Sequence, residues 1–196
     1  MKQSSSSRSR LAARRGVTLI EMMMVAVLIG LTTAFIAPKI DVTTYRVNGA
    51  MQGIGTTLLA AQRLAITRQH DVIVLFDTKT NAIRVHDDSD NNGEINGTEH
   101  VVTTPLGETI VYGLGGAPTM TEAAGPITFT KIRGDFLSLT FHRDGSASEA
   151  GIVYLTSQRA VNQGELPRDA RAIWVERATG QVSWYRYLPP NWKRGF

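Results

Sequence analysis

The segment from Asp88 to Glu99, DSDNNGEINGTE, has the most specific pattern of potential ligands in the chain. Aligned to a twelve-residue calcium-binding loop, its oxygen-bearing residues fall at ligand positions, and Gly93 falls at the sixth position, where such loops turn sharply. Calcium takes about six to eight oxygen ligands, so this segment is a candidate Ca²⁺ site. The residues at ligand positions are Asp88, Asp90, Asn92, Glu94 (through its carbonyl), Asn96 and Glu99.

The same segment also has the composition of an ordinary polar hairpin loop, because Asp, Asn and Gly favour turns. It follows a predicted strand, so a helix–loop–helix pair is not expected around it. Both interpretations stay open. The chain has no cysteine and therefore no disulfide, so a bound ion here would have the structural role of fixing a long loop.

A second chemical feature is one acid within an apolar stretch. The run from Val17 to Pro38 is interrupted by Glu21 and by threonines. As a helix, this run spans roughly the 30 Å of a membrane's hydrocarbon core. An ionised carboxylate in hydrocarbon costs roughly 2.5–3.5 kcal/mol. Glu21 therefore either has a specific partner or is protonated in the membrane.

The C-terminal segment SWYRYLPPNWKRGF interleaves aromatic residues with Arg186, Lys193 and Arg194. Such a segment binds nucleic acid when phosphates meet the cations and bases stack on the rings. The alternative is an edge strand, a Pro-Pro break and a solvated basic end.

No pattern typical of an enzyme appears. The histidines, at positions 70, 86, 100 and 142, are scattered and do not form an HExxH motif. The GLGG segment at 113–116 has no lysine and no predicted helix after it, so it is not a phosphate-binding loop. The absence of cysteine excludes thiol catalysis and thiolate metal sites. We therefore expect a binding or structural protein.

The charge of the chain is unevenly distributed. Its net charge is +4, but the first 16 residues contain five basic residues and no acid, so the rest sums to −1. The folded part therefore does not imply a polyanionic partner. Basic residues before an apolar run favour keeping that end in the cytoplasm. We therefore expect a single-pass membrane protein whose chain after Pro38 lies on the outer side.

The segment RRGVTLIE, residues 14–21, resembles the leader of type IV pilins and type II secretion pseudopilins. This resemblance implies that residues 1–16 are a leader peptide, cut after Gly16 by a prepilin peptidase, and that the new N-terminus, Val17, is methylated. Phenylalanine is commoner at that position, but other hydrophobic residues occur. Pro38 stands where these proteins often have a helix-kinking proline. In that family, Glu21 would pair with a neighbouring subunit's amine and set the register of assembly.

Two other interpretations of the N-terminus are a secretory signal peptide and a plain membrane anchor. The apolar run is too long for a signal peptide and lacks its cleavage site. A plain anchor leaves Glu21 unexplained.

Beyond Pro38, apolar residues recur at every third or fourth position, which is one face of a helix. We predict one helix from Val17 to about Thr67, kinked near Pro38, in which residues 39–69 continue the membrane segment 17–38. Its C-terminal half is expected to pack on the chain's own sheet, and its N-terminal half on neighbouring subunits. Glycines at 49, 53 and 55 each weaken it by roughly 1 kcal/mol relative to alanine. The stripe comprises Val47, Met51, Ile54, Leu58, Ala61 and Ala65.

Residues 70–196 have the alternation of β-strands and are expected to form one antiparallel sheet or sandwich. Segments 71–77 and 81–87 predict a hairpin, and Thr179-Gly180 predicts a tight turn. The fold class is therefore α+β, with a long N-terminal, partly transmembrane helix packed on an antiparallel β domain. The other predicted strands are 99–104, 108–114, 126–132, 137–145, 150–157, 171–180 and 181–188.

The segments FHRDGSASEAGIVYL and RAIWVERATGQVSWYRY resemble H-type minor pseudopilins and FimT-like minor pilins. Together, the two resemblances imply a structural subunit of a type II secretion or type IV pilus filament. Its expected partners are other pilin subunits, the prepilin peptidase and the inner-membrane assembly platform. The resemblance also implies a single-pass protein of the bacterial inner membrane, with its C-terminal domain in the periplasm or in an extracellular filament. The alternatives are a DNA-binding minor pilin for natural transformation and a membrane-anchored β domain that never polymerises.

Overall fold

A computed structural model of the chain describes residues 16–36, 42–94, 99–164 and 166–195. The chain divides into two compact units, residues 1–41 and 42–196. In the first unit, helix α1 spans Leu19–Ile36. In its described residues, the second unit contains helix α2, two short helical segments and ten strands. The predicted kink at Pro38 lies outside the described residues and stays a prediction.

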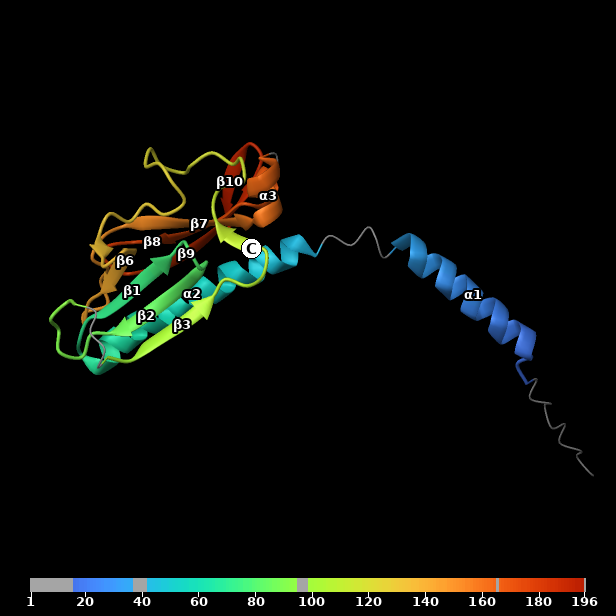
Figure 1. The fold of residues 1–196 in the computed structure, drawn as a ribbon, viewed down its shortest axis with the longest axis horizontal. Helices are drawn as coiled ribbons and strands as arrows, with labels where there is room; N and C mark the ends of the chain where they lie inside the picture. The colour runs from blue at the N-terminus through green and yellow to red at the C-terminus, as the bar shows by residue number, and fades with distance from the viewer. Residues whose placement is uncertain (1–15, 37–41, 95–98, 165, 196) are drawn as a thin grey trace, which may run out of the picture. The chain divides into compact units, whose positions relative to one another are not determined.

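Helix α2 runs from Thr43 to Arg68 and packs its apolar stripe against the sheets of the second unit (Figure 1). All six residues of the predicted stripe are buried, and Ala50 and Gly55 are buried with them. The helix ends where Gln69 adopts a left-handed conformation, with φ of 60°. Its N–H donates to the carbonyl of Ala65, which satisfies one of the helix's last carbonyls.

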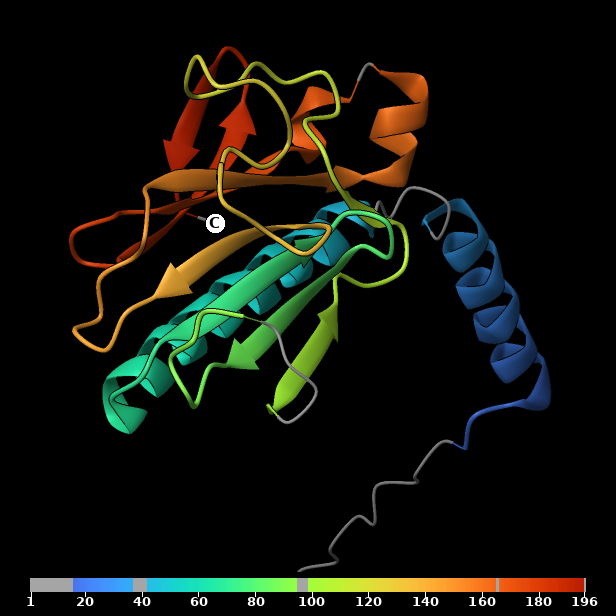
Figure 2. The ribbon, with the colours of Figure 1, turned by 60° about the vertical axis from the view of Figure 1, so that its left-hand side comes forward.

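Two five-stranded sheets make up the rest of the second unit, and all of their strand pairs are antiparallel (Figure 2). The first has the order β3-β2-β1-β6-β5 and the second the order β10-β9-β8-β7-β4. The antiparallel β-rich domain predicted from the alternation is confirmed. The strands are β1 (Val72–Asp77), β2 (Ala82–Asp87), β3 (Val101–Pro105), β4 (Ile110–Tyr112), β5 (Ile132–Arg133), β6 (Phe136–Phe141), β7 (Gly151–Ser157), β8 (Arg171–Val175), β9 (Val182–Leu188) and β10 (Asn191–Arg194).

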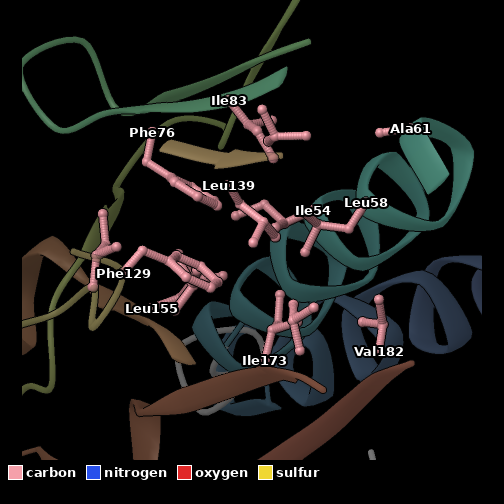
Figure 3. Close-up of a cluster of buried hydrophobic side chains, with 14 of the residues drawn as sticks. Ile54, Leu58, Ala61, Phe76, Ile83, Phe129, Leu139, Leu155, Ile173 and Val182 are labelled. Atoms are coloured by element: carbon pink, nitrogen blue, oxygen red, sulfur yellow. The ribbon is translucent and has the colours of Figure 1, made fainter. Parts of the chain in front are cut away.

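One hydrophobic core lies between α2 and both sheets (Figure 3). Ile54 and Leu58 of α2 reach toward Leu139 of the first sheet, while Ile173 of the second sheet lies against the same helix. This is the main core of the second unit, and two smaller clusters of buried side chains include Tyr187 and Tyr154.

The predicted hairpin is present, with Val74 opposite Val85 in the pairing of β1 and β2. The predicted tight turn is present too, because Gly180 has φ of 61° between β8 and β9.

A polar side chain of α2 joins two loops of the domain to the helix. Gln62 donates from Nε2 to the carbonyl of Gly145 at 2.7 Å and to that of Thr179 at 2.8 Å.

The predicted strand 126–132 is largely wrong. Ile127 makes one bridge to Val153, and only Ile132 belongs to a strand, β5. The Glu149 carboxylate accepts the N–H groups of Thr130 and Lys131 at 3.0 and 3.1 Å. At these two residues a side chain thus takes the place of a neighbouring strand, whereas the N–H of Thr128 still donates to the carbonyl of Ile152 in β7 at 3.0 Å. The sequence analysis also did not predict α3 (Gln158–Gln163), η2 (Pro167–Asp169) or β10.

Candidate functional sites

Gly16 and Val17 lie in a non-helical segment directly before α1, and both are exposed. The start of the helix has a local explanation. The Thr18 hydroxyl accepts the backbone N–H of Glu21 at 3.3 Å. Threonine followed three residues later by glutamate is the sequence pattern of a capping box. The peptide bond between Gly16 and Val17 is therefore exposed, and it lies directly before the capping residue, Thr18.

The surface of α1 is apolar on all sides. From Leu19 to Leu31, its large apolar side chains are exposed by between 46% and 79%. A water-soluble surface does not present a continuous apolar area of this kind without a partner. In the described part of the chain, however, no helix has both the length and the apolar character needed to cross a membrane. The predicted segment 17–38 ends outside the described residues.

Glu21 lies in the first turn of α1 and is exposed. An acid at this end of a helix is favourable because it faces the positive end of the helix dipole. Its position therefore has a local explanation besides the predicted pairing with a neighbouring subunit, and an experiment must separate the two.

The acidic loop begins directly after β2, and its first residue organises it. Asp88 is 1% exposed and accepts the backbone N–H groups of Asn92 and Gly93, at 3.1 and 2.9 Å. The predicted sharp turn at Gly93 is present, with φ of 71°. Asn91 also adopts a positive φ, and its side chain accepts the N–H of Asp71 at 2.9 Å, which ties the loop to the start of β1.

Three of the predicted ligands lie together. One carboxylate oxygen from each of Asp88, Asp90 and Glu99 lies within 4.8 Å of the other two. Asp90 is exposed, whereas the side chain of Glu99 exposes only 1% of its surface. Burial, together with the nearby charge of Asp90, raises the pKa of Asp88. Mutual repulsion opposes keeping three carboxylates this close when all are ionised.

Two other predicted ligands are part of the loop's own turns. Asn92 donates from Nδ2 to Asp90 at 2.8 Å and accepts the N–H of Glu94 at 2.6 Å. Glu94 is exposed. Asn96 lies outside the described residues.

His86 is a residue of this site that the sequence analysis did not assign to it. Its side chain is 6% exposed, and its Nδ1 lies 4.0 Å from Oε2 of Glu99. Burial and the charge of Arg84 lower the pKa of His86. Strand alternation contained the signal, because residues two apart on a strand share a face and His86 precedes Asp88 by two.

The other histidines do not join His86 in one site. His70 pairs with Asp87 at 3.1 Å, and His142 pairs with Asp71 at 2.9 Å. His100 is exposed.

The basic end is exposed at Lys193 and Arg194, as the alternative reading expected, but residues 191–194 form a further strand, β10, at the edge of the second sheet. Trp192 donates from Nε1 to the carbonyl of Pro118 at 2.9 Å, and its ring contacts the ring of Tyr187. The cations are partly brought together. Lys193 lies opposite Arg186 in the β9–β10 register, whereas Arg194 donates to the hydroxyl of Ser183 at 3.0 Å.

Comparison with family models and with curated proteins gave no match. Among solved structures, the chain is similar to the minor pseudopilin EpsH from the Type 2 Secretion System of Vibrio cholerae. The similarity has a TM-score of 0.47 and 13% sequence identity, and it covers 74% of this chain and 99% of that chain. This similarity is too low to carry an inference, so the proposals below rest on residues of the chain itself.

Proposed function

We propose that the chain is a structural subunit of a type II secretion or type IV pilus filament, of the minor pilin or H-type pseudopilin kind. A prepilin peptidase removes residues 1–16, the amine of Val17 is methylated, and the subunit is held in the inner membrane until assembly. The observation that carries this proposal is the surface of α1, which is apolar on all sides and bears one acid, Glu21.

The two helices have different partners in this proposal. The apolar stripe of α2 is already covered by the chain's own sheets. The large apolar side chains of α1 are exposed. Lipid before assembly, and the α1 helices of neighbouring subunits after it, are partners of the required chemistry.

Glu21 gives this packing its register. In a low-dielectric filament core, an unpaired carboxylate is costly, whereas a carboxylate that meets the amine of a neighbouring Val17 is compensated. Subunits that pack out of register leave both charges unpaired. Capping of α1 by Thr18 is an intramolecular effect and needs no second subunit.

The experiment compares Glu21→Gln with Thr18→Ala in cells that make the filament. Glu21→Gln removes the charge but keeps a side chain able to cap a helix. We expect it to abolish incorporation into filaments while the protein still fractionates with membranes. Thr18→Ala removes the cap and is expected to leave incorporation largely intact.

Normal incorporation of Glu21→Gln would refute the register role of Glu21 and favour a membrane-anchored β domain that never polymerises. Cleavage is tested separately by mass spectrometry of the native protein. The expected mass is that of residues 17–196 carrying one methyl group. A mass that includes residues 1–16, in cells with active prepilin peptidase, would refute the leader assignment.

A second candidate function, DNA binding, has one observation in its favour. Like charges directly opposite each other on a sheet are destabilising, and the pair of Lys193 and Arg186 has this arrangement. A bound phosphate would relieve the repulsion. Because β10 is a folded strand, the test is a gel shift of Lys193→Gln, with Lys79→Gln as a control outside the hairpin. Equal shifts would eliminate this candidate.

A further inference from the structure

The geometry points to a calcium ion held by the acidic loop between β2 and β3. The proposal concerns a different unit of the chain from α1 and is independent of the filament role. It rests on two observations, the distances among three carboxylates and the position of the buried His86 side chain.

The carboxylate distances suit one ion of this size. Calcium binds oxygen at about 2.3–2.6 Å, so two oxygens on opposite sides of one ion are at most about 5 Å apart. The oxygens of Asp88, Asp90 and Glu99 lie within 4.8 Å of one another and meet this condition together. Asp88 and Glu99 are the first and twelfth residues of the loop, so one ion joins its two ends.

The second observation is independent of the acids. His86 is buried on β2, and its Nδ1 has no hydrogen-bond partner within the described ranges. The nearest acidic oxygen, Oε2 of Glu99, is 4.0 Å away, just beyond hydrogen-bonding distance. A buried polar atom normally has a partner. In the proposed site, the Glu99 carboxylate binds the ion and accepts the Nδ1–H of His86.

His86 is accordingly a positioning residue. Carboxylates that ligate a metal are commonly held by a hydrogen bond from an outer group, and loss of that group weakens metal affinity about 10- to 100-fold. Calcium rather than a softer metal follows from the ligands, which are carboxylate, amide and carbonyl oxygens. Asn92 and the carbonyl of Glu94 stand at the loop positions that supply further oxygens.

The test is isothermal titration of the purified full chain in detergent with CaCl₂, after treatment with a chelator. We expect one ion per chain and a rise in the thermal unfolding midpoint when calcium is present. Asp90→Asn and Glu99→Gln should each abolish measurable binding, and circular dichroism confirms that they fold. Asp90 is exposed, so its variant keeps the test decisive if Glu99→Gln fails to fold. Glu122→Gln removes an exposed acid elsewhere and should bind as the parent does.

The role of His86 is tested by two variants. His86→Leu should weaken calcium binding about 10- to 100-fold, and His86→Gln, which keeps an N–H donor, should recover part of that loss. The site would be overturned if titration of calcium into the parent chain gave no heat of binding. It would also be overturned if Asp90→Asn bound calcium as tightly as the parent chain does. Tighter binding of zinc or manganese than of calcium would overturn the assignment of the ion.

Discussion

Replacement of Gly55 by alanine tests how α2 is seated on the second sheet. Glycine in a helix interior is normally a weakness, and alanine there stabilises a helix by about 0.8–1 kcal/mol. At Gly55, however, the new methyl group would lie 2.7 Å from Cε2 and 2.8 Å from Cζ2 of Trp184, and closer still to its Nε1. These atoms belong to the body of the indole ring, so the ring or the helix must move.

The expected magnitude follows from two opposing contributions. Overpacking a core typically costs about 1–3 kcal/mol, and the contact distances place Gly55→Ala in the upper half of that range. After subtracting the gain in helix propensity, we expect the free energy of unfolding to fall by about 1–2 kcal/mol.

Gly49 and Gly53 in the same helix are matched controls. A methyl group added at either position would meet nothing within 4 Å. Gly49→Ala and Gly53→Ala should therefore each raise the free energy of unfolding by about 0.8–1 kcal/mol. The contrast between Gly49→Ala and Gly55→Ala, about 2–3 kcal/mol, is more informative than either value alone.

The assay is urea unfolding followed by tryptophan fluorescence, because all three tryptophans, at 174, 184 and 192, lie in the second unit. A second background, Trp184→Leu, removes the ring that clashes. There, Gly55→Ala should become neutral or stabilising. Equal stabilisation by Gly55→Ala and Gly49→Ala in the parent chain would show that Trp184 does not lie against Gly55.

Two further predictions concern polar groups of the same unit. Gln62→Ala should lower the free energy of unfolding by about 1–3 kcal/mol, because the carbonyls of Gly145 and Thr179 both lose their donor; the exposed Gln52→Ala is the control, and equal urea midpoints for the two would contradict this. Burial alone would raise the pKa of Asp77, but hydrogen bonds from Thr80, Arg84 and Lys79 outweigh it and lower that pKa from 3.8 to about 2. Because the folded pKa is the lower one, the ionised carboxylate stabilises the fold above about pH 4, and this contribution disappears as the pH falls toward 2. Asp77→Asn should therefore flatten the loss of stability between pH 4 and pH 2, whereas the exposed Asp135→Asn should retain the parent's slope.

Much of the fold was predictable because it depends on local periodicity. The stripe from Val47 to Ala65 repeats with the helical period, and every member of it is buried. The hairpin of β1 and β2 and the turn at Gly180 follow from alternation and from the tolerance of glycine for positive φ. These features require only that each segment bury one face, and the identity of the partner does not matter.

The acidic loop was predictable in part. Spacing placed Asp88, Asp90 and Glu99 at ligand positions, and the structure brings these three carboxylates together. Spacing did not show that the ends of the loop are buried, and it did not assign His86 to the site. Both facts depend on Glu99 lying close to His86, and spacing along the sequence does not specify such a contact.

The remaining differences have one physical reason, which is that partners distant in the sequence are chosen by packing. Segment 126–132 alternates like a strand, but the Glu149 side chain accepts the N–H groups of Thr130 and Lys131 in place of a neighbouring strand. The chain end resembles a solvated tail, but Trp192 docks on the carbonyl of Pro118 and extends the second sheet. Helix propensity alone makes Gly55 a weak point of the helix, but Trp184 occupies the space of its missing side chain. Periodicity determines which face of a segment is buried, whereas the fold determines what covers that face.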